Sequence, residues 1–137
     1  MSFDRHFTNE LTPVFDTVEW GVTDAVITSP DGTVMFEQRG VEFPTSWSQN
    51  AVNVVANKYF RGGFDGDAKR ESSLRQTISR VATVITTWAA ADGLIIGTEI
   101  PIFRDELMYL LLHQVASFNS PVWFNVGVEK RPQCAAC

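Results

Sequence analysis

The chain has 137 residues, of which 45% are apolar and 20% are charged. This length suffices for one hydrophobic core but is short for two ordinary domains, and the apolar content argues against a disordered chain. Sixteen acidic and eleven basic residues give a net charge of −5, which excludes an overall basic surface for nucleic acid or for an anionic membrane.

The sequence also lacks the signals that direct a chain into or across a membrane. No run of 18 apolar residues is present, and residues 1–6, which include an acidic residue, lead into no apolar segment. It therefore predicts neither a membrane-spanning helix nor a secretory signal. We expect a single cytoplasmic domain over 1–137, with no nucleic-acid partner and no membrane partner.

The first part of the chain is predicted to be an arm followed by a β-hairpin. Residues 1–21 show no clean periodicity and are interpreted as the arm. Within 22–40, two runs rich in β-branched and aromatic residues, 24–28 and 33–38, flank the turn sequence Ser29-Pro-Asp-Gly32. Proline presets φ in such a turn and glycine supplies a positive φ, so the pattern is typical of a hairpin.

A layer of about three helices is predicted over 45–116. The first helix is expected to begin with Thr45 or Ser46 as its N-cap, the second near Glu71 or Ser72, and the third to run from about Pro101 to Ala116. The predicted core-facing stripes are, in order, Trp47, Ala51, Val54, Val55 and Tyr59; Leu74, Ile78, Val81, Ile85 and Trp88; and Phe103, Leu107, Leu110, Leu111 and Gln114.

The tail, 118–137, is interpreted as an extended strand followed by a cysteine motif. Pro121 argues against a regular helix, and the β-branched and aromatic residues that follow it favour a strand. Apolar residues fall on both faces, as in a strand covered on both sides, and the sequence offers nothing to cover the second face. We therefore expect an α+β fold, mainly α-helical, that is the front piece of something longer.

Few residues carry a chemical signal by themselves. Cys134 and Cys137 form a CxxC pair, which is compatible with half of a zinc site, with a redox pair or with two small buried thiols. The only histidines that could complete a zinc site are His6 and His113. Ser120 precedes a rigid turn, and a hydroxyl there can present a donor to an anion such as phosphate.

Several stretches together resemble the adenosylcobalamin-dependent, or class II, ribonucleotide reductases. They are Ser46-Trp-Ser-Gln49, Lys58-Tyr-Phe-Arg-Gly62, Phe103-Arg-Asp-Glu-Leu107, and the tail Phe118-Asn-Ser-Pro-Val-Trp-Phe-Asn-Val-Gly127 with Pro132-Gln-Cys-Ala-Ala-Cys137. The resemblance covers about 20–137. It implies that the chain is the N-terminal region of an enzyme that reduces ribonucleotides to deoxyribonucleotides by a radical mechanism, and that its tail enters the first strand of a ten-stranded α/β barrel.

The same resemblance implies roles for individual residues. Cys134 matches one of two cysteines that reduce the ribose 2′ position and become a disulfide, while Cys137 matches a structural position. Ser120 is a candidate contact for the substrate phosphate. Ala135 stands where the family commonly has a serine, so a substrate contact there is lost or is made by the backbone. Adenosylcobalamin would generate a thiyl radical on a third cysteine, and no residue that binds this cofactor is identified in the chain.

Cys134 is expected to need a partner elsewhere. In an extended strand the Cα atoms of Cys134 and Cys137 would lie about 10 Å apart, beyond the roughly 6 Å of a disulfide. We therefore expect the isolated chain to be inactive, with the ribonucleotide and the remainder of the reductase as partners, and an open apolar strand to favour a homo-oligomer. Two alternatives stay open: a stand-alone interaction module derived from the reductase, and a small zinc-binding protein.

Overall fold

The computed structural model describes residues 3–63 and 69–136. Packing divides the chain into two compact units, one over 18–77 and the other made of 1–17 together with 78–137. Each unit is described by itself below. The expected single domain and its segment boundaries stay a prediction.

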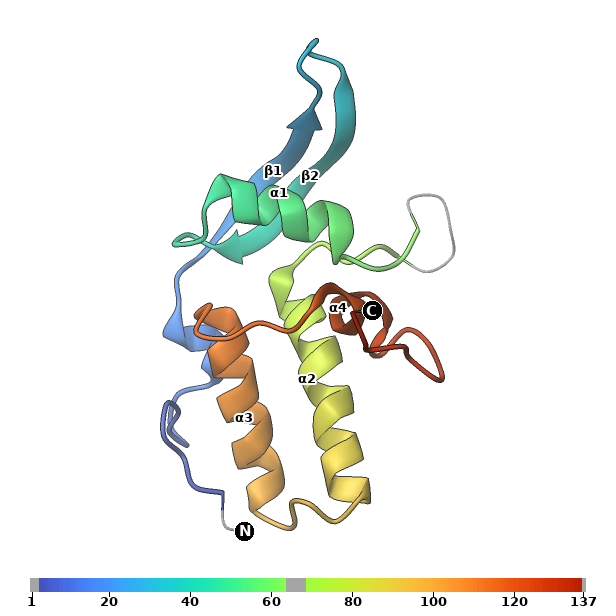
Figure 1. Cartoon of the computed structure of the whole chain (residues 1–137). Coiled ribbons are helices and arrows are strands. Elements are labelled where there is room, and N and C mark those ends of the chain that lie inside the picture. Colours follow the sequence, from blue (N-terminus) through green and yellow to red (C-terminus); the bar gives the residue numbers. More distant parts are fainter. Residues whose placement is uncertain (1–2, 64–68, 137) are drawn as a thin grey trace. The chain divides into compact units, whose positions relative to one another are not determined.

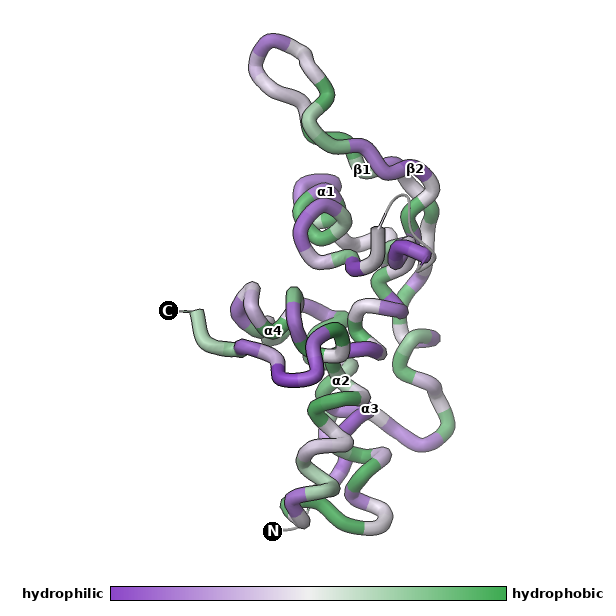
Figure 2. Tube along the Cα trace, turned by 90° about the vertical axis from the view of Figure 1, so that its right-hand side faces the viewer, coloured by the Kyte–Doolittle hydropathy of each residue, from purple (hydrophilic) through white to green (hydrophobic). Residues whose placement is uncertain are grey.

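The unit over 18–77 is built on the predicted hairpin, which is confirmed. Strands β1 (Trp20–Thr28) and β2 (Val34–Pro44) pair antiparallel with Ala25 opposite Gln38, and both extend further from the turn than the sequence indicates. The turn is hydrophilic (Figure 2), and Gly32 has a φ of +86°. Hydrogen bonds from the Ser29 hydroxyl and the Thr33 backbone lower the pKa of Asp31 to about 2, so this carboxylate stays charged and stabilises the turn.

Helix α1 (Gln49–Lys58) packs on the hairpin (Figure 1). Its N-cap is Ser48, whose hydroxyl accepts from the Ala51 N–H at 3.2 Å, so the predicted cap at Thr45 or Ser46 is wrong. The buried face also differs in part from the predicted stripe: Val54 is exposed, and the buried residues are Val52, Val55 and Ala56. The sequence still ends this helix at the expected place, before the Arg61-Gly-Gly segment.

Helix α2 (Leu74–Ala91) is confirmed, including most of its inward stripe. Leu74, Ile78 and Val81 are buried, whereas Trp88 at the far end is 42% exposed. The helix begins two to three residues later than predicted. The Gln76 side chain accepts from the backbone N–H groups of Ser72 and Ser73 just before the helix, donors that have no intrahelical acceptor at a helix start.

In the second unit, a 3-10 helix, η1 (Val14–Thr17), packs on helix α3 (Glu99–Leu112). Pro101 lies in the first turn of α3, as predicted, but the helix ends four residues before Ala116. Gln114 has a φ of +55°, a left-handed conformation that ends a right-handed helix. Leu111 is buried as expected, together with Met108 and Leu112.

The predicted strand at 118–128 is wrong. Helix α4 (Ser120–Asn125) occupies this segment, with Pro121 in its first turn, and no strand is assigned to 132–136. Proline is tolerated in a first helical turn because its missing N–H would have no intrahelical partner there. Trp123 and Val126 are buried, and the Trp123 indole N–H donates to the Phe118 carbonyl at 3.1 Å.

In the part of the chain that the structure describes, a hairpin and a set of helices confirm the α+β class, and the expected C-terminal strand is absent. Within the described residues, no helix combines the length and the apolarity needed to cross a membrane.

Candidate functional site

The predicted site residues lie around α4 and the segment that follows it. Two asparagines flank this helix, Asn119 as its N-cap residue and Asn125 as its last residue. The Asn119 side-chain amide donates to the Cys134 carbonyl at 3.0 Å, and that of Asn125 donates to the Gln133 carbonyl at 2.8 Å. We call these two residues the asparagine clamp. Together they hold the backbone on both sides of the Cys134 Cα atom against α4.

Cys134 itself is a free, half-buried thiol. Its sulfur lies 3.7 Å from the Pro132 carbonyl, within the range of a weak S–H donor. The adjoining Ala135 is exposed, and its N–H donates to the Gln133 side-chain oxygen at 3.4 Å. A thiol in this setting is accessible to a reaction partner while its backbone is held.

Ser120, the first residue of α4, is half-buried and directly follows the asparagine that binds Cys134. The structure therefore brings the backbone of Cys134 to the end of α4 at which Ser120 stands, although 14 residues separate the two in sequence. A phosphate contact by Ser120 stays a prediction. Cys134 and Ser120, two of the residues to which the resemblance gives a role, therefore lie in one neighbourhood of the unit.

Arg80 of α2 holds the opposite end of α4. Its guanidinium donates to the Trp123 carbonyl at 3.1 Å and to the Val126 carbonyl at 2.7 Å, which are acceptors left open at a helix C-terminus. Gly127 then turns the chain with a φ of +78°, and a Cβ atom there would lie 2.5 Å from the Arg80 Cγ. A glycine is therefore required for the backbone to pass the arginine side chain.

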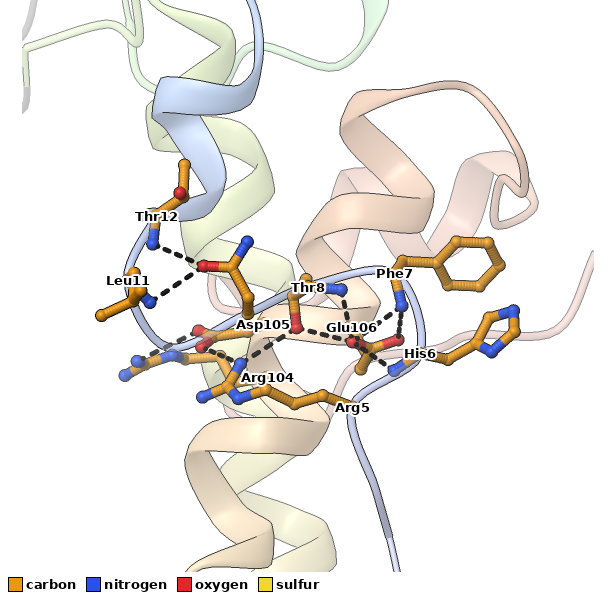
Figure 3. A network of polar contacts seen from close by, with 10 residues as sticks. Arg5, His6, Phe7, Thr8, Leu11, Thr12, Arg104, Asp105 and Glu106 are labelled. Carbon is orange, nitrogen blue, oxygen red and sulfur yellow. Dashed lines mark hydrogen bonds and ion pairs between the residues drawn. The ribbon is translucent and has the colours of Figure 1, made fainter.

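A second polar cluster ties the N-terminal arm to α3 (Figure 3). The carboxylate of Glu106 accepts from the backbone N–H groups of His6, Phe7 and Thr8 at 2.9–3.1 Å, and from the Thr8 hydroxyl at 2.5 Å. Arg5 adds an ion pair with Asp105 at 2.9 Å. Sequence analysis missed this cluster, because nothing in the arm's pattern shows which helix it contacts.

The same cluster fixes the charge state of Glu106, which is buried. Burial raises the pKa of this carboxyl, but the hydrogen bonds from Thr8, Phe7 and His6 outweigh burial and leave the pKa below its ordinary value of 4.5. The carboxylate is therefore ionised at neutral pH and serves as the anchor of the arm. No reaction is indicated at this cluster, since its acceptors are already bonded to the arm.

The described residues give the zinc hypothesis no support. His113 contacts the Thr17 hydroxyl through Nε2 at 2.8 Å and stacks on Tyr109, and burial lowers the pKa of the imidazole. His6 packs edge-on against Phe7. Across 3–63 and 69–136, no three metal-binding side chains come together, and Cys137 lies outside these ranges.

The expectation that Cys134 cannot pair with Cys137 rested on an extended strand. The structure assigns no strand there, so that reason fails, and because Cys137 lies outside the described residues the separation of the two thiols stays a prediction.

Comparison with known proteins gives a consistent result. A family model described as class II vitamin B12-dependent ribonucleotide reductase matches residues 21–64 and 63–114. Proteins named vitamin B12-dependent ribonucleotide reductase are similar to the chain: 50% identical in Streptomyces avermitilis, 49% in Streptomyces coelicolor and 46% in Rhodopirellula baltica. The matches cover 96%, 96% and 84% of this chain, but only 14%, 14% and 11% of the relatives.

Proposed function

Because the chain belongs to the family of class II vitamin B12-dependent ribonucleotide reductases, we propose that it forms the N-terminal part of such an enzyme and supplies a reducing thiol, Cys134, to its active site. The observation that carries the proposal is the free, half-buried Cys134 held beside α4 by the asparagine clamp. Ribonucleotides are the proposed substrates and deoxyribonucleotides the products.

The proposed chemistry of Cys134 is a two-electron reduction shared with a second cysteine in the remainder of the reductase. The ribose loses its 2′-hydroxyl as water and gains hydrogen at that carbon. The two thiols give up two protons and two electrons, and a disulfide forms between the two sulfurs. A partner sulfur must therefore approach to bonding distance, which requires the partner Cβ to lie about 3.5–4.5 Å from that of Cys134.

Substrate binding is proposed at Ser120 and Ala135. The Ser120 hydroxyl, at the start of α4, would donate to the substrate phosphate. Ala135 is exposed and has no side-chain donor, and its N–H makes a long contact of 3.4 Å with the Gln133 side chain. That N–H is the group on Ala135 that could bind the substrate.

Adenosylcobalamin is the cofactor that the family implies, and none of three cavities lined by described residues fits it. These cavities have volumes of about 350, 240 and 230 Å³. Drug-sized ligands already occupy about 300–1,000 Å³, and a corrin ring with its nucleotide loop is larger than such ligands. We therefore assign no cofactor chemistry to the residues of this chain and propose that the remainder of the reductase binds the cofactor.

We also propose the remainder of the reductase as the main partner, a second copy of the chain as a further one, and the cytoplasm as the location. The basis for the first is that the chain spans about 14% of the length of the Streptomyces relatives.

A chimaera tests the proposal. The chain replaces its matching 135-residue segment in the Streptomyces avermitilis reductase, to which it is 50% identical. We expect the chimaera to convert ribonucleotides to deoxyribonucleotides with the B12 cofactor and a dithiol, and Cys134→Ser to abolish this turnover. Cys137→Ser is the matched control and should leave the turnover intact. Undiminished turnover in the Cys134→Ser chimaera would refute the assigned role.

A further inference from the structure

We infer that Asn119 and Asn125 are positioning residues that aim the Cys134 side chain. They act from the two ends of α4 on two consecutive backbone carbonyls, those of Gln133 and Cys134, at 2.8 and 3.0 Å. Both amides act as donors to main-chain oxygens, so the hold does not depend on which side chains stand at 133 or 135.

Peptide geometry explains why two such bonds suffice. Each peptide group is planar, so the backbone has only two soft torsions per residue, φ and ψ. The Gln133 carbonyl lies in the peptide plane before the Cys134 Cα atom, and the Cys134 carbonyl lies in the plane after it. Restraining both planes therefore restrains φ and ψ of Cys134, and with them the direction of its Cα–Cβ bond.

The remaining freedom belongs to the thiol alone. Rotation about χ1 moves Sγ among three staggered positions without moving the backbone. A sulfur that alternates between a thiol and a disulfide needs this rotation, because a disulfide forms only within a restricted range of Cβ–Cβ distances. The support for α4 is itself rigid, because Arg80 bonds the carbonyls of Trp123 and Val126 at the far end of this helix.

This inference deepens the proposed function and takes its meaning from the assigned role of Cys134. The bonds themselves can be tested without any enzymatic activity, in the 137-residue chain. Asn119→Leu and Asn125→Leu remove the donors while keeping a similar side-chain volume and adding no charge. Asn50→Leu is the matched control, because Asn50 is exposed in the first turns of α1.

The first measurement is nuclear magnetic resonance of Cys134. Its three-bond HN–Hα coupling reports φ directly and should move, in both clamp variants, towards the average of an unstructured residue, while the control keeps the value of the unsubstituted chain. If the coupling is unchanged in a folded Asn119→Leu and a folded Asn125→Leu chain, the clamp is refuted.

The second measurement is the rate of alkylation of Cys134 by iodoacetamide, resolved from Cys137 by tandem mass spectrometry. It is read on the alkaline plateau, where the thiol is fully ionised and the rate reports access. We expect a rise of about fivefold in each clamp variant, the factor that corresponds to loss of a hydrogen bond of about 1 kcal/mol, and less than a twofold change in the control.

Two further measurements, amide exchange in the unsubstituted chain and kinetics in the chimaera, complete the test. If a leucine variant does not fold by circular dichroism, the side-chain amide protons of Asn119 and Asn125 in the unsubstituted chain must exchange with solvent more slowly than those of Asn50; equal rates would refute the clamp. In the chimaera, the clamp variants should lower kcat about fivefold with KM unchanged. A chimaera that stays active as Cys134→Ser rejects the proposed function, whereas the coupling and alkylation results then still decide the clamp.

Discussion

At the scale of single residues, the most consequential group outside the α4 region is Glu106. A buried carboxylate is costly unless hydrogen bonds compensate it, and here the arm provides four donors: three backbone N–H groups and the Thr8 hydroxyl. Residues 3–13 of the arm have no helix or strand, so their order depends on these bonds rather than on their own helical propensity. Substitution of Glu106 should therefore loosen the arm.

We predict that Glu106→Gln lowers the free energy of unfolding at pH 7 by about 2 kcal/mol, because a neutral amide loses charge-assisted bonds and turns an N–H towards the arm's own donors. Denaturant unfolding measures the loss, and limited proteolysis should cut the arm faster. Glu10→Gln, at an exposed position of the same arm, is the control and should change neither. Equal stability of the two variants would contradict the anchoring role.

The lowered pKa of Glu106 predicts a pH dependence of the same anchor. Since the folded state holds the proton less tightly than the unfolded state, the stabilisation is complete above the ordinary pKa of 4.5 and is lost as the pH falls through the folded-state value. The unsubstituted chain should therefore lose stability below pH 4.5 more steeply than Glu106→Gln. Unfolding curves collected at a series of acidic pH values measure this difference, and parallel losses would exclude it.

At Gly127 the surrounding atoms leave no room for a side chain. Gly127→Ala places a Cβ atom at a φ of +78° and 2.5 Å from the Arg80 Cγ, and we predict a loss of about 2–3 kcal/mol. Gly97→Ala, at a φ of +54° with nothing within 4 Å, is the control and should lose only about 1 kcal/mol of backbone strain. Thermal or denaturant unfolding measures both losses of stability, and their difference gives the cost of the contact between the new Cβ and Arg80. Equal losses in the two variants would exclude such a cost.

At the scale of elements, α4 depends on Arg80 to bind its last carbonyls. Arg80→Met keeps the aliphatic length but removes the donors to Trp123 and Val126. We predict about tenfold faster hydrogen exchange of the amides just after the helix, Val128 and Glu129, which bond the Asn125 carbonyl.

Arg39→Met is the matched control for this exchange experiment. Arg39 pairs with Asp24 at the surface and is 72% exposed, so its removal should leave the amides of Val128 and Glu129 unaffected. An unchanged exchange rate of these amides in Arg80→Met would show that α4 does not depend on the hydrogen bonds from Arg80.

The sequence predicts elements well where local chemistry decides them. The hairpin follows from Ser29-Pro-Asp-Gly32 between two β-branched runs, and α2 follows from Leu74, Ile78 and Val81 at helical spacing. The prediction of a strand in the tail is wrong because Val122-Trp-Phe favours a strand by propensity, while the contacts that hold the helix come from Arg80 in α2. Pro121 by itself predicts a break in a helix, whereas in a first turn proline is compatible with a helix start.

The candidate site likewise has residues that the sequence predicts and contacts that only the fold reveals. Cys134, Ser120 and Ala135 could be selected from a motif, and the CxxC pair stands out by spacing alone. The asparagines of the clamp lie within the motif, yet their role requires knowing that the chain returns to α4 after Gly127. The anchor at Glu106 lies about 100 residues from its donors, a separation over which no sequence period carries information.

At the scale of the whole molecule, the number of cysteines limits what the chain can do alone. The resemblance implies three cysteines in the reaction, one radical and two reducing, and this sequence contains two. We therefore predict that the purified 137-residue chain, supplied with adenosylcobalamin, a ribonucleotide and a dithiol, forms no deoxyribonucleotide above background. Chromatographic separation of the nucleotides measures the product, with the active chimaera as the positive control. Product from the isolated chain would mean that the reaction proceeds with fewer thiols than the family implies, and the assignment of Cys134 as one of a reducing pair would then fall.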